Sequence, residues 1–538
     1  MRSPLTMLAP SISEVFDSCG FTATGLVEYL GTDVMAAARR GEPEAVRCAL
    51  AGRDDEPLAT LVSAFLLHDE TPLSSLRAVF GSELCDALLE HGVVGRRSWF
   101  WADDAEHGAS LGESQNVSVT ALIDIQPHII AGKSFLVFSD VDASMLPDYV
   151  PGPDHVLGVG AASVSLLNIT PTSCAGSVLD IGTGSGVQAL GQLDKATSIT
   201  ATDIHPRALD LAEATFAAAG ALDRVELLSG AWCEPVSGRL FDRIVANPPF
   251  VVGPPVISHV YRDSGLDLDG ATQRVISDAI AHLQPGGTAH ILGAWVHTVD
   301  ESWRQRVAQW FPEFGVAAWI VERDRVDPAR YVGTWLRDES IDPRSVAGRD
   351  KTRAWLQHFS DAGVTEVGFG YIAVKLFDDA TVVDGSVVSA GASEILAEEL
   401  PHLYNGNLGD ESLAYFDRID WLRNRDVAEI LDSQFMVSND VAKEEVFTHD
   451  AALGMGFAQH VIRLTRMTGP CWSHEIDAHI AAIVAGLHPD GLSLGEVAQL
   501  FAVSKGLDPD SVVLDIVAVV IDLVRHGFLI PTDAASAL

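Results

Sequence analysis

The stretch Val178-Leu-Asp180-Ile-Gly182-Thr-Gly184-Ser-Gly186-Val-Gln-Ala decides the fold of this chain, because an apolar run enters three alternate glycines and then a helical pattern. The apolar run predicts a buried strand, and the glycines predict a tight turn into a helix. Glycine permits positive φ and has no side chain to keep a ligand away from the backbone. The free amides at the start of the following helix can meet a carboxylate or a phosphate. The segment is a candidate ligand-binding loop, and the alternative is a strand-to-helix turn that binds nothing.

Strands and helices alternate on both sides of this loop, from about Ser163 to Leu376. Such alternation is typical of right-handed crossovers and a buried parallel sheet. The expected strands are residues 177–181, 198–203, 225–228, 241–246 and 288–292, and two late strands, 317–321 and 369–375, close the edge of the sheet.

The chain on either side of this α/β region has different patterns. Residues 1–147 show helical spacing followed by β-rich runs, so we expect an N-terminal helical domain with a small sheet, available for substrate recognition. A cluster of prolines then marks a linker, and the core domain spans 154–378. Residues 390–538 predict a mostly helical C-terminal domain, whose last two helices and terminal strand resemble a winged helix.

The composition is that of a globular protein with a strongly negative charge. The 538 residues are 47% hydrophobic and 20% charged, and the formal net charge is −39. A field of that sign repels phosphate, so generic electrostatic capture of nucleic acid is disfavoured. The amino terminus has no secretory apolar stretch, the six cysteines are scattered, and no segment is long enough to span a bilayer. We therefore expect a cytoplasmic protein with no membrane contact and no metal site.

A second strand is expected to end at Ala201-Thr-Asp203-Ile-His205-Pro206, about twenty residues after the glycine loop. An acid at that place can accept the two ribose hydroxyls of an adenosine cofactor. Asp203 is therefore the candidate ribose ligand. The structural alternative is that Asp203 caps the helix that begins near Pro206, and the two roles do not exclude each other.

The fourth expected strand, 241–246, delivers Asn247-Pro248-Pro249-Phe250 at its carboxyl end. A planar NH₂ conjugated to a carbonyl group or a purine ring is a poor nucleophile, because its lone pair is delocalised. The Asn247 side-chain oxygen and the Pro248 carbonyl can orient both N–H bonds, and Phe250 can stack on the flat substrate group. Alignment and exclusion of water are the main contributions of such a site. The alternative is an ordinary turn after a proline-stopped strand.

Together with the glycine loop, Asp203 and Leu283-Gln-Pro285-Gly286-Gly287, this motif resembles the class I S-adenosylmethionine-dependent methyltransferases. The resemblance is to the group with a small methyltransferase domain, which methylates planar amide or exocyclic nitrogens, and it covers about 154–376. It implies a Rossmann-like core with a mostly parallel seven-stranded sheet and S-adenosylmethionine as cofactor. The implied cofactor-binding residues are Asp180, Gly182, Gly184, Gly186, Asp203, Trp232 and Asn247. Trp232 is included because Ala231 stands where many relatives carry an acid that contacts the adenine.

Candidate substrate residues follow from the same resemblance. Pro249 belongs to the motif, Tyr261 and Arg262 lie in a loop expected to cover the pocket, and Trp295 follows the fifth strand. Each of these side chains has a packing role as its alternative. The segment 155–160, just before the first core helix, is expected to line the cofactor.

The leading functional prediction is N-methylation of a macromolecule, with a protein glutamine amide preferred to an RNA or DNA base amino group because of the negative charge. The cluster Arg39, Arg40, Arg47 and Arg53 favours RNA, unless it is a solvated helix face. A third alternative is a binding or regulatory protein with a degenerate methyltransferase core, and the intact Asn247 and Asp203 argue against it.

Overall fold

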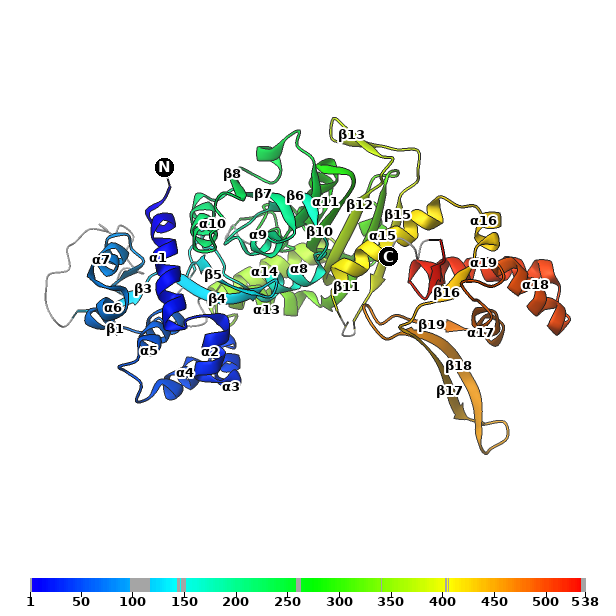
Figure 1. Ribbon diagram of the computed structural model, residues 1–538, viewed down its shortest axis with the longest axis horizontal. Coiled ribbons are helices and arrows are strands. Elements are labelled where there is room, and N and C mark those ends of the chain that lie inside the picture. The colour runs from blue at the N-terminus through cyan, green and yellow to red at the C-terminus, as the bar shows by residue number, and fades with distance from the viewer. Residues whose placement is uncertain are drawn as a thin grey trace.

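The computed structural model describes residues 2–96, 117–142, 146, 151–257, 263–339, 341–401, 404 and 406–533. Figure 1 shows an elongated molecule with the N-terminal helices at one end, a large sheet in the middle and the C-terminal elements at the other end. The sheet is the structural centre, because most of its strands are apolar and largely buried.

The N-terminal part is helical with a small sheet. Its helices are α1 (Pro4–Cys19), α2 (Ala23–Leu30), α3 (Thr32–Arg39), α4 (Pro43–Leu50), α5 (Pro57–Leu61), a π-helical turn (Val62–Leu66), α6 (Leu73–Phe80) and α7 (Ser82–Glu90). The sheet has the order β1 (Thr71–Pro72), β3 (Ser118–Ala121), β2 (Val94–Gly95). A hairpin of β4 (Asp124–Ile130) and β5 (Lys133–Ser139) follows.

This N-terminal part is held directly against the core helix α10 (Pro206–Ala218). The Thr6 hydroxyl on α1 donates a hydrogen bond to Glu213 at 2.8 Å, and the amide of Phe138 on β5 donates to Thr215 at 3.0 Å. Apolar residues of α10 share one buried cluster with those of α1.

The central sheet contains eight strands in the order β15-β11-β12-β10-β9-β6-β7-β8. Only β12 runs antiparallel to its neighbours in this sheet. The strands are β6 (Ala175–Ile181), β7 (Ala196–Asp203), β8 (Val225–Ser229), β9 (Phe241–Ala246), β10 (Leu283–Thr298), β11 (Val316–Val326), β12 (Val364–Leu376) and β15 (Glu394–Glu399). The Rossmann-like α/β fold class is therefore confirmed.

The sheet has one strand more than the seven predicted. The additional strand, β15, pairs in parallel with β11, although its residues belong to the stretch that the sequence assigns to the C-terminal domain. Its sequence, Glu-Ile-Leu-Ala-Glu-Glu, is half-buried along most of its length and has no clear two-residue alternation. Sequence periodicity could not detect it for that reason.

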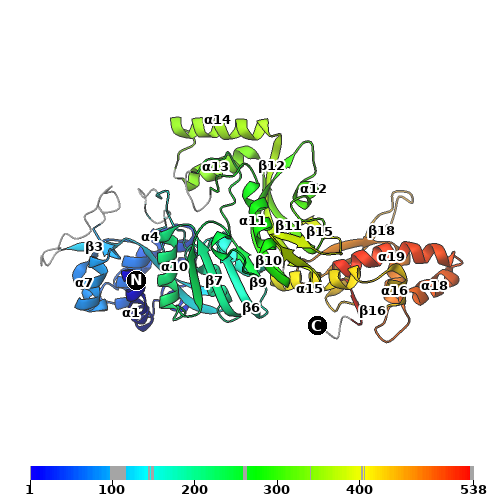
Figure 2. The same cartoon turned by 90° about the horizontal axis from the view of Figure 1, so that it is seen from above.

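Helices cover the sheet, and one helical pair stands apart from it. The covering helices are α8 (Ala161–Ile169), α9 (Val187–Gln192), α10, α11 (Gly270–Ala281) and α12 (Trp303–Ala308). Between β11 and β12 the chain inserts α13 (Pro328–Asp338) and α14 (Val346–Asp361), which the sequence analysis did not identify. We call residues 328–361 the α13–α14 lobe, and Figure 2 shows it projecting from the body of the molecule.

The C-terminal part is more mixed than the predicted, mostly helical domain. After the hairpin of β13 (Thr381–Val383) and β14 (Ser386–Val388), its elements are α15 (Leu408–Arg423), α16 (Val427–Asp432), β16 (Phe435–Val437), β17 (Val441–His449), β18 (Phe457–Arg466), β19 (Ser473–Ile476), α17 (Ala478–Ala485), α18 (Leu494–Lys505), α19 (Pro509–Arg525) and β20 (Leu529–Pro531). The sheet β17-β18-β19 was missed because β17 and the outer half of β18 alternate poorly and are largely solvent-facing. In the described ranges, no helix combines the length and the apolar character needed to cross a membrane.

Candidate active site

The glycine loop joins β6 to α9 in the backbone conformation that only glycine adopts without strain. Gly182, Gly184 and Gly186 have φ values of 70°, 54° and 88°. A Cβ atom at Gly186 would also lie 2.8 Å from the Phe216 ring, whereas a Cβ at Gly182 or Gly184 would meet no atom within 4 Å. The first two glycines therefore border open space, which is the condition for a ligand to approach the backbone.

Strand register brings the three sequence motifs to one edge of the sheet. Ile181 of β6 pairs with Ala246 of β9 on one side and with Thr202 of β7 on the other. The next residue on each strand is Gly182, Asn247 and Asp203, and neighbouring strands lie about 4.8 Å apart. The motifs therefore meet at the carboxyl ends of parallel strands, where open α/β sheets bind their ligands.

Asp203 is held in place by the glycine loop that it faces. One carboxylate oxygen accepts the amide of Gly184 at 2.9 Å, and the other accepts the amide of His205 at 2.9 Å. The second contact is local, but Asp203 does not cap α10, because His205 is the N-cap residue and that helix has no side-chain cap hydrogen bond. Burial raises the pKa of Asp203, while these two amides act in the opposite direction. The carboxylate therefore lies at the turn with its orientation already determined.

Asp180, the last polar residue of β6, is fully buried beneath the loop. Its Oδ2 atom accepts the Thr183 hydroxyl at 2.7 Å and the Ala189 amide at 3.2 Å. Its Oδ1 atom is buried without a hydrogen-bond partner in the part of the chain that the structure describes. Burial raises the pKa of Asp180 to about 7. Asp180 thus joins both ends of the loop, and Thr183 is a member of this arrangement that the sequence analysis missed.

We expect the Asp180 carboxyl to make stability depend on pH. The pKa of Asp180 in the folded protein lies above its ordinary value, so the folded state holds the proton more tightly than the unfolded state. The resulting contribution to the free energy of unfolding is fully present below about pH 4 and is lost as the pH rises to about 7. Urea unfolding of the wild type and of Asp180→Asn between pH 4 and 8 tests this directly. The wild type should lose stability relative to the variant across that window, and the difference should be constant at higher pH. Parallel curves across the whole range would show that Asp180 does not titrate there.

The Asn-Pro-Pro-Phe motif begins at the residue after β9 ends. Pro248 is buried, whereas Asn247 and Phe250 are half-buried. Among the described residues, the Asn247 side chain has no hydrogen-bond partner. Phe250 packs at the border of two apolar clusters. An amide without a partner at the ligand-binding edge of the sheet is available to bind a substrate.

Two residues that the sequence analysis missed hold the backbone after this motif. The Val252 amide donates to the Tyr331 hydroxyl on α13 at 2.7 Å. The Trp355 ring on α14 lies so close to Gly253 that a Cβ there would be 3.0 Å from it. Tyr331 and Trp355 lie about 80 and 100 residues further along the chain, so no local pattern could connect them with the motif.

Trp232 lies in the turn that follows β8. Its backbone is in the left-handed region, with a φ of 51°, and its carbonyl accepts the Thr202 hydroxyl at 3.4 Å. Its side chain is half-buried against the core. The turn is therefore close to the end of β7, and contact of the Trp232 ring with an adenine remains a prediction.

The prediction that Trp295 contacts substrate is wrong. Its side chain is 0% exposed, its indole N–H donates to Glu322 at 2.7 Å, and its ring stacks on Trp303 with 5.5 Å between centroids. The strand β10 continues past the site edge of the sheet, so Trp295 lies in the packed interior between elements. Tyr261 and Arg262 lie outside the described residues.

The segment 155–160 lies against the glycine loop. The Ser185 hydroxyl donates to the Leu157 carbonyl at 3.0 Å. Buried Asp140, at the end of the N-terminal part, accepts the Val156 amide at 2.8 Å and is itself bound by Arg207. These contacts join the end of the N-terminal part to the loop, so Asp140 and Arg207 position this lining.

Comparison with known proteins places this geometry in a family. The model of the methyltransferase small domain matches residues 158–297. A release factor glutamine methyltransferase of Aliivibrio fischeri is 30% identical over 198 residues, which cover 35% of this chain and 67% of that protein. The chain belongs to the S-adenosylmethionine-dependent methyltransferases of the small-domain family. S-adenosylmethionine is the cofactor of this family.

Other relatives match shorter parts of this chain. A release factor glutamine methyltransferase of Gloeobacter violaceus is 33% identical over 21% of this chain and 45% of its own. A ribosomal RNA small subunit methyltransferase C of Serratia proteamaculans is 32% identical over 27% of this chain and 38% of its own. The chain thus spans about half the length of most curated relatives it matches. Two families described as domains of unknown function, DUF7059 and DUF7782, match residues 18–103 and 413–531.

A solved T. thermophilus 16S rRNA N2 G1207 methyltransferase, in complex with AdoMet and guanosine, matches 45% of this chain and 58% of its own. The identity is 21% and the TM-score is 0.26. A likeness this low carries no information about the substrate of the present chain.

The residues at the site fit the family cofactor. Open space borders Gly182 and Gly184, and the Asp203 carboxylate is oriented at the end of the neighbouring strand, where ribose hydroxyls can be accepted. The amides of Thr183, Gly184 and Gly186 already donate hydrogen bonds within the protein, to Thr202, Asp203 and Thr183.

Proposed function

We propose that this protein transfers the methyl group of S-adenosylmethionine to the side-chain amide nitrogen of a protein glutamine. The observation that carries the proposal is the strand register that puts Asn247, with its amide unpartnered in the described structure, beside Gly182. The glycine loop and Asp203 form the cofactor half of the site, and Asn247-Pro-Pro-Phe forms the acceptor half.

The chain's own residues would orient the acceptor amide. The Asn247 side-chain oxygen and the Pro248 carbonyl accept its two N–H bonds, so that the nitrogen lone pair is turned away from the amide plane. Phe250 supports the flat face of the amide. S-adenosylmethionine, when bound, supplies a sulfonium-activated methyl group. The nitrogen forms a bond to the methyl carbon, the carbon–sulfur bond breaks with its electron pair going to sulfur, and the nitrogen then loses a proton to water.

A protein acceptor agrees with the electrostatics of the chain. The net charge of −39 repels an RNA backbone. The basic cluster that favoured RNA is largely engaged, since Arg40 binds Glu42, Arg47 binds Asp69, and Arg53 donates to the Tyr29 carbonyl. The relatives named as release factor methyltransferases favour the same choice. Methylation of an RNA amino group stays as the second candidate because of the Serratia relative.

The cytoplasm is the proposed compartment. All six cysteines are free thiols in the structure, as is usual in a reducing environment. We also propose that the N-terminal domain, residues 1–147, takes part in substrate recognition.

The acceptor class can be determined by labelling. Full-length protein is incubated with methyl-radiolabelled S-adenosylmethionine and a bacterial lysate, and the products are digested separately with ribonuclease and with protease. We expect a label that resists ribonuclease, is lost on proteolysis and yields N-methylglutamine on complete enzymatic digestion. A label that survives protease but not ribonuclease would overturn the protein acceptor.

A further inference from the structure

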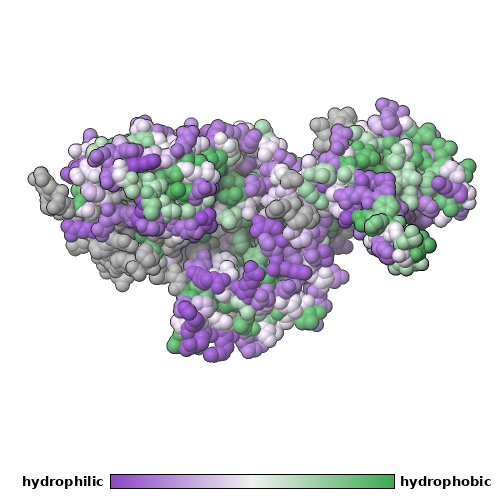
Figure 3. Space-filling view, turned by 90° about the horizontal axis from the view of Figure 1, so that it is seen from below, coloured by the Kyte–Doolittle hydropathy of each residue, from purple (hydrophilic) through white to green (hydrophobic). Residues whose placement is uncertain are grey.

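The α13–α14 lobe differs in charge from the rest of the chain. Residues 328–361 contain six Lys or Arg and five Asp or Glu, a net charge of +1, so the rest of the chain carries −40. Figure 3 shows hydrophilic residues gathered over this lobe, in the lower centre of the view. The slightly positive lobe therefore differs in sign from the strongly negative remainder of the chain.

Half of the lobe's cations are neutralised within the lobe. Lys351 binds Glu339, Arg344 binds Asp342, and Arg353 binds Asp350. Most of the lobe's acidic groups are thereby occupied, and Asp361 accepts a hydrogen bond from Gln357 at 2.8 Å.

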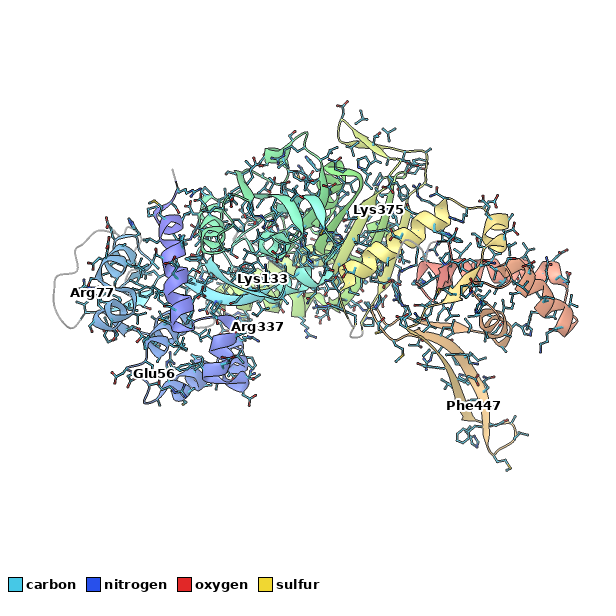
Figure 4. All side chains as sticks on the ribbon, in the orientation of Figure 1. Glu56, Arg77, Lys133, Arg337, Lys375 and Phe447 are labelled. Carbon is cyan, nitrogen blue, oxygen red and sulfur yellow. The ribbon has the colours of Figure 1, made fainter. Side chains whose placement is uncertain are left out.

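The other three cations, Arg330, Arg337 and Arg349, are exposed and have no acidic partner in the described parts of the chain. Arg337 contacts only Thr334 at 3.4 Å, and Arg349 donates to the Arg344 carbonyl. Arg330 and Arg337 are seven residues apart on α13, so they share one helix face and are separated by about 10.5 Å along its axis. Figure 4 labels Arg337 at the lower side of the core.

The same lobe packs on the catalytic motif. Tyr331 of α13 accepts the amide of Val252, and Trp355 of α14 lies against Gly253. Residues 251 and 252 share an apolar cluster with both helices. The unpartnered arginines therefore belong to a rigidly attached neighbour of the site at which the acceptor amide must arrive.

We propose that the α13–α14 lobe is the docking surface for an acidic segment of the protein that carries the acceptor glutamine, and that Arg330, Arg337 and Arg349 bind its carboxylates. This inference rests on the proposed function. Guanidinium groups pair with carboxylates through two parallel hydrogen bonds. A short acidic segment needs only a local patch, whereas the further phosphates of an RNA would face the −40 of the remaining chain, and this difference favours the protein partner.

The test compares two full-length variants with the same change in net charge. The lobe variant carries Arg330→Glu, Arg337→Glu and Arg349→Glu. The control variant carries Arg2→Glu, Arg96→Glu and Lys505→Glu, three exposed cations outside the lobe. The probe is ribonuclease-treated lysate protein, titrated as the acceptor with radiolabelled S-adenosylmethionine, and cofactor affinity is measured separately by calorimetry.

We expect the lobe variant to raise the apparent KM for acceptor protein about tenfold or more, with kcat within about twofold and cofactor affinity unchanged. A variant with glutamine at the three positions should raise the apparent KM less than the glutamate variant does. This graded response would show that the effect follows the charge and does not come from a folding defect. Raising salt should increase the KM of the wild type more than that of the lobe variant.

An unchanged KM in the lobe variant, or an equal increase in the control variant, would overturn the docking surface while leaving the methyl transfer intact. Ribonuclease-sensitive labelling that is lost in the lobe variant would replace the acidic protein segment by RNA. If the wild type labels nothing although it binds the cofactor, the proposed function itself fails.

Discussion

Asn247→Ala should reduce turnover about 100- to 1,000-fold or more while S-adenosylmethionine still binds with near wild-type affinity. The range is the one seen when a single oriented polar group is removed from a transition state. We expect turnover and cofactor binding to respond differently because Asn247 belongs to the acceptor half of the proposed site, beside Gly182 of the cofactor half. The Asn247 side chain makes no hydrogen bond to the described protein. Removing it therefore costs little folding stability but leaves the acceptor amide unoriented.

The measurement combines calorimetric cofactor binding with a labelling rate on lysate protein. Asn168→Ala, at an exposed position on α8, is the matched control because it deletes the same amide away from the site. Asn247→Asp is informative as well, since it retains one acceptor oxygen while adding charge. Full turnover in Asn247→Ala would refute the proposed role of the motif, and lost cofactor affinity would move Asn247 to the cofactor half of the site.

Asp203→Ala should weaken S-adenosylmethionine binding about 10- to 150-fold. Hydrogen bonds to a charged group contribute about 1.5–3 kcal/mol, and that range converts to this change in affinity. The carboxylate already accepts the amides of Gly184 and His205, so part of the loss would come from a looser glycine loop.

The ribose role can be separated from this structural role by the choice of ligand. Wild type should bind S-adenosylhomocysteine better than its 2′-deoxy analogue, and Asp203→Ala should bind the two equally. The thermal unfolding of the wild type and of Asp203→Ala, compared without ligand, reports only the stability lost with the contacts of Asp203 to Gly184 and His205. If the variant still distinguishes the two ligands as the wild type does, then another residue holds the ribose.

Local patterns were sufficient for much of the fold. The early strands were predicted close to their observed bounds, because Val178, Leu179, Ile244 and Val245 belong to short apolar runs that a buried parallel sheet requires. The glycine loop was predictable for a similar reason, because its positive φ values require glycine, and the alternate glycines are visible in the sequence. The strand β15 and the sheet β17-β18-β19 were missed because half-exposed strands lack that signal.

The Trp295 error has a different cause. A tryptophan after a strand near a candidate site looks the same in sequence whether it faces a ligand or the interior. Its position was decided by Glu322 and Trp303, which bind and stack on it from other elements. Sequence position alone could not separate these two cases, because burial depends on neighbours that are distant in the chain.

By itself, the sequence determined which segments turn sharply, which are buried strands, and which three motifs resemble a methyltransferase site, because each of these properties is local. Only the tertiary structure decided that Gly182, Asp203 and Asn247 meet, since hydrogen-bonded register between strands is a relation among segments some 20 to 65 residues apart. The tertiary structure also decided that Tyr331 and Trp355 contact the backbone just after the Asn-Pro-Pro-Phe motif. Those contacts arise from packing, which no residue pattern specifies in advance.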